Sequence, residues 1–530
     1  MIKIKENHLE WALKHLQKYS HSDFYPRLFE FAAISHNWQA VKEYILSLDM
    51  SIYEPKSPML HLASKPNGAF RVAHQLDPID SLIYTALIRE VCETIEQYRI
   101  PESENIACSY RIKPDTEGSF FAKDTGWNIF TSRTDDLIKK FENGYVLVAD
   151  ITDFYNQIYT HRINSLISEA SKGAYDEQAA IIENFLLAMN RKTSRGIPVG
   201  PGPSIILAEL IMASIDNFII DNYTKDFVRY VDDIRIFFHT IEDAITILHN
   251  LTFFLYSYHR LVCSSEKTRI LDVETFATKY LLDERKVEQS AIKDQADALT
   301  SEKMDELIAS LPPYTECFDY DKAYEETLQQ ILTQDQFSLL SSAYYKLVEQ
   351  ALIPPIDYVL LRHVIRQAAR YRIRSIIPLV LDNFYMILPV IRESVIYLKA
   401  VINKKVVQQN KARFEQIFSH FYMTLPFINL WVSYLLQDDS FNEINLPANY
   451  ARITSIRGQA LIALRRKDTT WVKGHREQID LLGFWDKRAT LYSASLLPAS
   501  EMLPLIRSIA ASGDIIDKSL ASFMSSKKKT

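Results

Sequence analysis

Two adjacent aspartates at the tip of an apolar stretch are the residues of this chain best suited to chemistry. Asp232 and Asp233 follow residues 227–231 (FVRYV) and precede residues 234–238 (IRIFF). Neighbouring carboxylates between β-prone runs are costly unless something binds them, and hard divalent cations prefer carboxylate oxygens. The pattern predicts a metal site of the kind that two-metal nucleotidyl transfer requires. A solvated turn is the alternative for this motif taken alone.

A third aspartate follows a short apolar run upstream. Residues 145–149 (YVLVA) are rich in valine and predict a buried strand, which ends at Asp150. If that strand neighbours the Asp232-Asp233 turn, three carboxylates share one pocket. Asp150, Asp232 and Asp233 are therefore the candidate catalytic residues and metal ligands. In the alternative interpretation, Asp150 belongs only to the turn after the strand.

A glycine-rich loop lies between these acids in the sequence. Residues 195–204 (RGIPVGPGPS) hold three of the twelve glycines, including Gly200, and glycine lets a backbone approach a ligand closely. Ser204 is expected to cap a helix that runs to Ile220. Such a loop and helix start can lie under a base pair, whereas an ordinary proline-rich connector is the alternative.

The order of these segments carries more information than any one of them. It consists of Asp-x-x-Asp-Phe-Tyr at 150–155, Gly-x-Pro-x-Gly-x-x-x-Ser at 196–204, Tyr-x-Asp-Asp at 230–233 and LVCSSEKT at 261–268. This order resembles the palm motifs of reverse transcriptases, over roughly residues 60–285. The resemblance implies an α+β fold with reverse-transcriptase-like palm and fingers, in which an antiparallel sheet carries the acids.

The same resemblance implies individual roles around the acids. Asp150 and Asp232, with Asp233 beside them, resemble the metal-ligating group, and the backbone carbonyl of Ile151 is a further ligand. The implied cofactor is Mg²⁺ or Mn²⁺. Tyr155 matches the position where an aromatic ring excludes a ribose 2′-hydroxyl, which favours dNTP substrates.

Four further residues are expected to bind the nucleotide. Residues 65–73 (KPNGAFRVA) resemble the fingers hairpin, with Lys65 and Arg71 flanking a triphosphate. Gly200 lies in the loop described above, and Lys267 is placed to meet the leaving phosphates. A solvent-exposed hairpin and an ordinary surface lysine are the alternatives for the basic residues.

Departures from the reverse transcriptase pattern bear on the template. Templated members usually carry Gln where this chain has Val199, Pro where it has Ile205, and Asn where it has Glu209. A valine side chain neither donates nor accepts a hydrogen bond. These departures put templated synthesis in question and leave the metal chemistry untouched.

The second half of the chain has no motif of this kind. Apolar and charged residues recur there at helical spacing, and the runs are 357–369, 376–386, 391–402, 414–423 and 427–437. They predict an α-helical, HEAT-like repeat domain. A palm joined to such a region is similar to the abortive-infection reverse transcriptases of the AbiK type and the prophage-encoded type. The expected divisions are 1–60 (N-terminal helical segment), 61–285 (fingers and palm) and 286–530 (helical repeat domain).

That similarity implies an unusual activity. Members of the family act in antiphage defence, make single-stranded DNA without a template, and attach it covalently to one of their own hydroxyl groups. They form closed homo-oligomers, and a trimer is favoured here over a hexamer. Tyr44 is the priming candidate, although an amphipathic-helix tyrosine is its alternative. An RNA-templated reverse transcriptase, as in retrons or group II introns, and a non-catalytic scaffold with a degenerate palm remain alternatives.

Composition sets the limits of these hypotheses. The chain has 530 residues, is 47% hydrophobic and carries a formal net charge of −6, so any DNA must meet a local basic channel. Its four cysteines are far apart and show no metal-ligand spacing, which is typical of a reduced compartment. We therefore expect a cytoplasmic protein without a membrane span, and the resemblance to the abortive-infection family implies a bacterial one.

Overall fold

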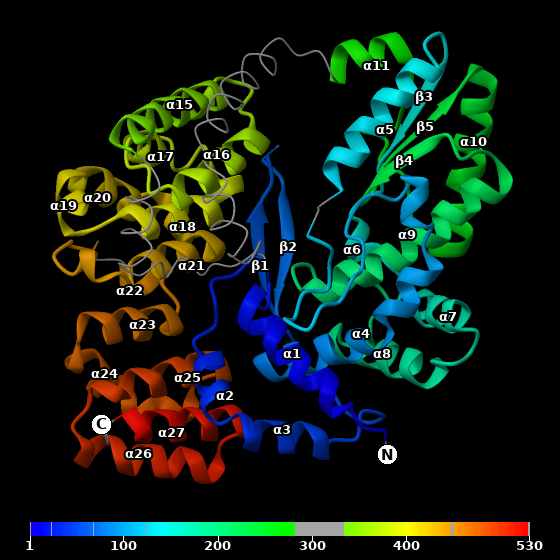
Figure 1. Ribbon diagram of the computed structural model, residues 1–530. Coiled ribbons are helices and arrows are strands. Elements are labelled where there is room, and N and C mark those ends of the chain that lie inside the picture. The colour runs from blue at the N-terminus through cyan, green and yellow to red at the C-terminus, as the bar shows by residue number, and fades with distance from the viewer. Residues whose placement is uncertain are drawn as a thin grey trace. The chain divides into compact units, whose positions relative to one another are not determined.

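The computed structural model describes residues 2–22, 24–66, 68–123, 126–280, 333–446 and 450–527 (Figure 1). Contacts divide the chain into two compact units. Unit 1 contains Met1–Asp23, Ile45–Met59 and His74–Val287, and unit 2 contains Phe24–Tyr44, Leu60–Ala73 and Glu288–Thr530. The divisions 1–60, 61–285 and 286–530 stay a prediction, and the boundary between residues 285 and 286 lies outside the described residues.

An antiparallel sheet of four strands forms the centre of unit 1. Its order is β4-β5-β3-β6, and the strands are β3 (Tyr145–Ala149), β4 (Phe227–Tyr230), β5 (Asp233–Phe238) and β6 (Arg269–Asp272). Because Tyr230 pairs with Asp233, only Val231 and Asp232 form the turn between β4 and β5. The predicted strand at 145–149 and the predicted hairpin around the two aspartates are confirmed.

Helices contact both faces of this sheet. One face packs against α5 (Trp127–Lys140) and α11 (Val273–Tyr280), and the other contacts α10 (Ile241–Phe254); Figure 1 shows α5 and α10 on opposite sides of the strands. Alternate residues of the strands point to the same face. The core on the α5 face accordingly contains Phe130, Val146, Val228, Phe237 and Phe276.

The remaining helices of unit 1 include one long apolar helix, α9 (Gly202–Asn222), which packs against α4 and α7. The others are α1 (Glu6–Tyr19), α4 (Pro78–Tyr98), α6 (Phe154–Gln157), α7 (Thr160–Ser171) and α8 (Asp176–Met189). Among the described residues, α9 alone is long and apolar enough to cross a membrane by length and composition, and 78% of its apolar window is buried. That burial fits the core helix of a folded unit.

The start of α9 corrects one prediction. The helix begins at Gly202 and Pro201 is its N-cap residue, so Ser204 lies inside the first turn. Proline is favoured at the first turn because its missing N–H has no partner there anyway, and Pro203 takes this role. The Ser204 hydroxyl instead lies 3.0 Å from the Tyr84 hydroxyl, so it ties α9 to α4.

A two-stranded hairpin lies mostly in unit 2. It consists of β1 (Met59–Ser64) and β2 (Phe70–Gln75), and the N–H of Lys65 donates to the carbonyl of Ala69 at 2.8 Å. The hydroxyl of Tyr25 donates to the carbonyl of Ala73 at 2.8 Å, and the Arg71 guanidinium lies 6.0 Å from the Phe24 ring centre. The predicted hairpin at 65–73 is confirmed, and residues 24–25 hold its second strand.

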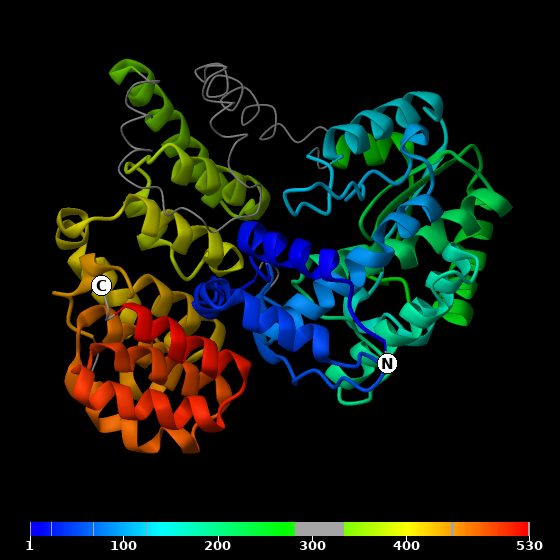
Figure 2. The same cartoon turned by 60° about the horizontal axis from the view of Figure 1, so that its bottom comes forward.

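All regular elements in the described part of residues 333–527 are helices, as predicted. Successive contacts join α15, α16, α18, α21, α23, α25 and α27, which follow one another in chain order in both views (Figures 1 and 2). A HEAT-like repeat remains a prediction. The helices are α15 (Gln334–Leu352), α16 (Tyr358–Arg370), α17 (Ile377–Asp382), α18 (Ile391–Val401), α19 (Lys404–Gln409), α20 (Lys411–Ser419), α21 (Pro426–Leu435), α22 (Tyr450–Ile453), α23 (Ile456–Arg466), α24 (Thr469–His475), α25 (Phe484–Ser493), α26 (Ala499–Ser512) and α27 (Ile515–Lys527).

Two N-terminal helices also contribute to unit 2. They are α2 (Glu30–His36) and α3 (Trp38–Ser47), of which α3 continues three residues into unit 1. Helix α2 contacts α27, and the buried carboxylate of Glu30 pairs with Arg457 at 2.7 Å. Unit 2 is therefore built from segments at both ends of the chain.

Candidate active site

Two of the three predicted acids lie at the ends of two neighbouring strands, β3 and β5. Ala149 pairs with Ile234, and the same register extended by one step sets Asp150 against Asp233. Residues directly opposite each other on neighbouring strands point to the same face. Burial raises the pKa of the Asp233 carboxyl, and the negative charge of Asp150 raises it further, although Arg235 at 3.3 Å opposes both effects.

The third acid, Asp232, occupies the turn itself. It follows Val231, whose φ is +55°, in a two-residue turn between β4 and β5. A positive φ at the first turn position matches the right-handed twist of a hairpin, but it is strained for a β-branched residue. The cost of such a conformation is about 1–3 kcal/mol, and it persists only where the surroundings enforce it.

The charge nearest to Asp150 in the structure is that of Lys267. The ammonium nitrogen lies 3.0 Å from both carboxylate oxygens of Asp150. The side chain of Lys267 is 64% exposed and that of Asp150 is 19% exposed, so water screens this pair. The ammonium thus occupies a position where the Asp150 carboxylate can receive a cation.

The backbone of Ile151 pairs with the segment before β6, and its role as a ligand stays a prediction. The N–H of Thr152 donates to Val262 at 2.9 Å and the N–H of Ser264 donates to Asp150 at 2.7 Å. Ile151 and Cys263 therefore form a pair without mutual hydrogen bonds, in which the Ile151 carbonyl points away from residues 262–264. It faces the side of the sheet on which β5 lies.

The glycine loop joins this region through Tyr155 and His74. The N–H of Ile197 donates to the carbonyl of Tyr155, at the start of α6, at 3.0 Å. Gly200 has a φ of +123°, which only glycine adopts readily. The backbone N–H of Val199 donates to the ring atom Nδ1 of His74 at 3.1 Å. The carbonyl of Val199 accepts from the backbone N–H of His74 at 3.1 Å. The N–H and the carbonyl of Val199 are both paired with His74, and its buried side chain has no hydrogen-bonding group.

A buried ion cluster lies on the inner side of the turn. Arg229 has no exposed surface, and its guanidinium contacts both oxygens of Asp216 at 2.7–3.0 Å and one oxygen of Glu209 at 3.0 Å. Glu209 also pairs with Arg99 at 2.8 Å. Burial opposes the charge of Arg229, but Asp216 and Glu209 raise its pKa above the ordinary value. Each charge in the cluster is thus balanced.

These cluster residues had no role in the predicted site. Glu209 appeared only as a departure, and Asp216 and Arg229 were not considered. A signal was available, because Glu209 and Asp216 are seven residues apart on an otherwise apolar helix and so share one face. Two acids on a buried face require a basic partner.

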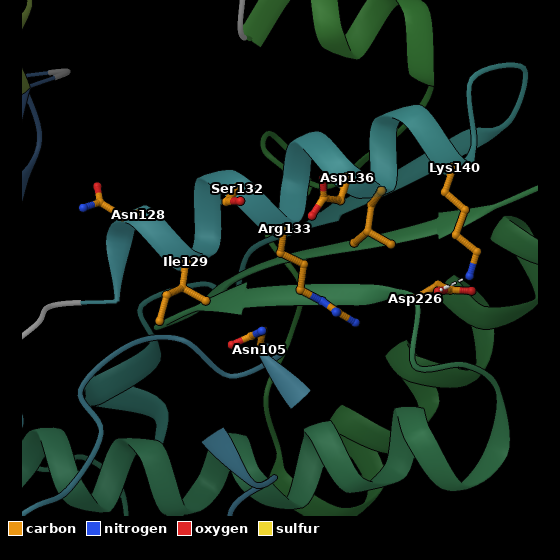
Figure 3. A pocket seen from close by; sticks show the side chains of 9 residues that line it. Asn105, Asn128, Ile129, Ser132, Arg133, Asp136, Lys140 and Asp226 are labelled. Carbon is orange, nitrogen blue, oxygen red and sulfur yellow. Dashed lines mark hydrogen bonds and ion pairs between the residues drawn. The ribbon is translucent and has the colours of Figure 1, made fainter. Parts of the chain in front are cut away.

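A surface cavity of about 560 Å³ also opens beside α5 (Figure 3). None of the predicted site residues lines it. Arg133 donates to the carbonyls of Lys225 and Phe227 at 2.7 and 3.0 Å, and Lys140 pairs with Asp226 at 2.6 Å. Because these basic groups already have partners, the cavity does not compete with the turn as the candidate site.

Comparison with known proteins decides the class of this domain. Residues 64–294 match the family described as reverse transcriptase (RNA-dependent DNA polymerase). The chain contains a reverse transcriptase domain. No curated protein matches the chain in sequence.

Solved telomerase structures show a distant similarity. The Candida albicans telomerase with a TWJ fragment of telomeric RNA has a TM-score of 0.31 and 11% identity, and the match covers 73% of this chain and 68% of that chain. The apo telomerase of Candida tropicalis has a TM-score of 0.33 and 11% identity, with coverage of 76% and 73%. Scores at this level say nothing about what this chain does.

The reverse transcriptase domain implies a polymerase, and such domains generally use divalent metals, typically Mg²⁺. Within the described residues, no three His, Cys, Asp or Glu side chains are gathered as a metal-binding group. The chemistry of the donors nevertheless fits, because Asp150 already accepts a cationic group through both oxygens. Asp150, Asp232, Asp233 and the carbonyl of Ile151 would hold the ions. When bound, the ions supply activation of the attacking oxygen and neutralisation of the phosphates.

The predicted phosphate-binding hairpin belongs to the other unit. Lys65 and Arg71 lie in the part of the reverse transcriptase match that packs within unit 2, whereas the aspartates, Tyr155 and Lys267 lie in unit 1. Their role in binding the triphosphate stays a prediction.

The tyrosines near the N-terminus differ in accessibility. Tyr44, on α3, is 40% exposed. Tyr25 has no exposed surface, its hydroxyl donates to Ala73, and burial raises its pKa. Of these two, Tyr44 is the more exposed, and its role as primer stays a prediction.

Proposed function

We propose that this chain is a DNA polymerase that starts a strand on its own hydroxyl group, without a template, and acts in abortive-infection defence against phage. The reverse transcriptase domain supplies the polymerase class. The observation that carries template independence is Val199, whose side chain is buried and whose backbone is closed by His74. This loop has no side-chain amide with which to hold a nucleotide against a template base.

The proposed chemistry is a phosphoryl transfer. In the first step, a side-chain oxygen of the protein attacks the α-phosphorus of a dNTP. An oxygen–phosphorus bond forms, the bond to the β-phosphate breaks, pyrophosphate leaves, and the hydroxyl proton passes to solvent. The 3′-hydroxyl of the attached nucleotide then attacks the next dNTP in the same way. Asp150, Asp232 and Asp233 bind the cations that this reaction needs.

The remaining predicted residues act on the nucleotide. Tyr155 excludes the ribose 2′-hydroxyl, Lys267 leaves Asp150 and meets the departing phosphates, and Lys65 and Arg71 bind the triphosphate. Tyr44 is the proposed primer, because its side chain is exposed whereas that of Tyr25 is not. A Tyr155→Ala variant tests the first of these roles, since unchanged selection against ribonucleotides would remove it.

Labelling of the protein tests the proposal directly. The purified chain is incubated with labelled dNTPs and Mg²⁺ or Mn²⁺, without primer or template, and half of the sample is treated with nuclease before a denaturing protein gel. We expect nuclease-sensitive label that migrates with the protein. Tyr44→Phe should lose the label, whereas the matched variant Tyr25→Phe should retain it. Label retained in Tyr44→Phe would move the priming site elsewhere.

The description of the matched family favours a second candidate function, an RNA-templated reverse transcriptase. The same assay distinguishes the two, because a templated enzyme shows no label until an RNA template and a primer are added. No incorporation under either condition would favour a non-catalytic scaffold.

Assembly and location belong to the same proposal. We expect a closed homo-oligomer, with a trimer favoured over a hexamer, in the bacterial cytoplasm and without a membrane. Mass photometry of the purified protein measures the assembly directly, and a monomer at all concentrations would contradict it.

A further inference from the structure

Both backbone groups of Val231 are held by side chains that converge on one carboxylate. The N–H of Val231 donates to the hydroxyl oxygen of Ser109 at 2.8 Å, and that hydroxyl donates to Oε1 of Glu209 at 2.7 Å. The carbonyl of Val231 accepts from Nη1 of Arg229 at 2.8 Å, and Nη2 of the same guanidinium donates to Oε2 of Glu209 at 3.0 Å. Glu209 thus anchors two arms of a clamp around one strained residue.

Local pairing of the chain brings Ser109 to the turn. Residues 106–108 run parallel to β4, since the N–H of Arg229 donates to Ile106 at 2.8 Å and the N–H of Cys108 donates to the carbonyl of Arg229 at 3.0 Å. Ala107 faces Arg229 in this pairing, and two residues further along the chain Ser109 meets Val231. The clamp is therefore part of the sheet edge.

Burial gives the clamp its stiffness. Ser109, Glu209 and Arg229 are each at most 1% exposed, so water is not available to replace a lost partner. Burial raises the pKa of the Glu209 carboxyl, but the positive charges of Arg229 and Arg99 outweigh this effect and lower the pKa below its ordinary value. A charged Glu209 accepts from the Ser109 hydroxyl, which leaves the Ser109 oxygen free to accept from Val231.

We propose that Ser109 and Glu209 are positioning residues of the polymerase site. They hold the Val231 peptide in its left-handed conformation, and this conformation sets the direction of Asp232 and the start of β5 at Asp233. Neither residue touches the reacting atoms. Their effect reaches the cation through the backbone of the turn. The inference rests on the proposed function only in that the aspartates bind a divalent cation.

A purely structural role predicts a different result. If the clamp only contributes to folding, loss of one arm lowers the melting temperature and leaves the cation affinity of the folded protein unchanged. If the clamp positions the aspartates, the cation affinity falls in protein that is still folded. Glycine at position 231 adopts a φ of +55° without strain, so it should make the clamp less necessary.

The test measures Mn²⁺ binding by electron paramagnetic resonance without nucleotide, on the full chain. We expect Ser109→Ala to raise the Mn²⁺ dissociation constant about tenfold, the effect of one lost hydrogen bond of the stronger, charge-assisted kind. The double variant Ser109→Ala/Val231→Gly should recover most of that loss. Ser214→Ala is the matched control, because it removes a buried hydroxyl that contacts Arg162 and His259 instead of the turn.

Each outcome decides the matter. Weaker Mn²⁺ binding in Ser109→Ala, rescued by Val231→Gly, supports the positioning role. Unchanged affinity in folded Ser109→Ala, or no rescue by glycine, overturns it. A wild-type protein that binds no Mn²⁺ overturns it as well. If the wild-type protein binds Mn²⁺ but never incorporates dNTPs, the proposed function fails and the positioning role is still tested by the variants.

Discussion

The two sides of the turn at Val231 and Asp232 are built in opposite ways. On the outer side, Lys267 is 64% exposed and pairs with Asp150 alone among the described acids, and Asp233 is only partly buried beside Arg235. On the inner side, the charges have almost no exposed surface, and each contacts at least one charge of opposite sign; they are Arg99, Glu209, Asp216 and Arg229.

Energetics explains what this difference achieves. An exposed ion pair contributes about 0–1 kcal/mol, so the outer carboxylates can exchange an ammonium group for a metal ion at little cost. A buried charge that loses its partner costs about 3–5 kcal/mol, so the inner charges stay as they are while the chain is folded. The reactive groups can thus exchange one partner for another, whereas the groups that hold the backbone keep their partners.

The first prediction concerns a substitution on the outer side of the turn. Asp232→Asn removes one carboxylate from the turn and keeps its size and its turn preference. We expect nucleotide incorporation to fall by at least about a thousandfold, because charge stabilisation by bound cations is worth several kcal/mol. The melting temperature should stay within about 2 °C of the wild-type value. Incorporation by labelled dNTP and thermal unfolding measure the two effects.

A matched control for that variant is Asp226→Asn. Asp226 pairs with Lys140 at 2.6 Å on the surface of unit 1, so the same change in charge occurs outside the site. Incorporation should be unchanged in this control. Full activity in Asp232→Asn would remove Asp232 from the catalytic group.

The second prediction concerns a substitution in the buried ion cluster on the inner side of the turn. Arg229→Met leaves the carboxylates of Asp216 and Glu209 in the interior without this guanidinium. We expect the free energy of unfolding of unit 1 to fall by about 3–5 kcal/mol. Urea unfolding followed by tryptophan fluorescence measures the loss. Lys140→Met, which breaks an exposed pair of the same unit, should cost less than about 1 kcal/mol, and equal costs in the two variants would contradict the comparison.

The outer side could be predicted from the sequence because its signals are local. The valine-rich run at 145–149 and the hairpin around Asp232 follow from residue type and alternation within a few positions. The helical runs after residue 356 were predicted on the same basis and are confirmed as α16, α17, α18, α20 and α21. The helix start at Ser204 was misjudged, because capping preference competes with proline and the glycine-rich loop within the same three residues.

The inner side could not be predicted in the same way. Its members come from the segment that follows α4, from α9 and from β4. The two acids on α9 indicate that a basic partner exists, but nothing local to them identifies Arg99, Arg229 or Ser109. Only the tertiary fold brings Ser109 within 2.8 Å of Val231. The hairpin at 65–73 is an intermediate case, because its turn is local but its packing against Tyr25 is not.

The third prediction concerns the pH dependence of stability that arises from His74. His74 is buried and accepts from the Val199 N–H, and burial lowers its pKa to about 4. Between about pH 6.5 and pH 4, the unfolded chain binds a proton that the folded imidazole does not, so stability falls as the pH falls. At pH 4, this one group has lowered the free energy of unfolding by on the order of 3 kcal/mol.

His74→Asn isolates that group. The amide oxygen of Asn replaces Nδ1 as acceptor and does not titrate, so the slope of unfolding free energy against pH should decrease by the share of one proton. Urea unfolding at several values between pH 4 and 7 gives the slope for both proteins. Equal slopes would mean that His74 titrates alike in the folded and unfolded chain.

The smallest effect is expected for Lys267→Ala, on the outer side. Its exposed pair with Asp150 contributes less than about 1 kcal/mol, so the melting temperature should hardly change. Without the competing ammonium, Mn²⁺ should bind the aspartates up to about fivefold more tightly, which corresponds to about 1 kcal/mol. Incorporation should nevertheless slow, because the variant has no cation to meet the leaving phosphates. Tighter cation binding with slower synthesis would separate the two roles of Lys267, whereas weaker Mn²⁺ binding would show that the ammonium group supports the site instead of competing for it.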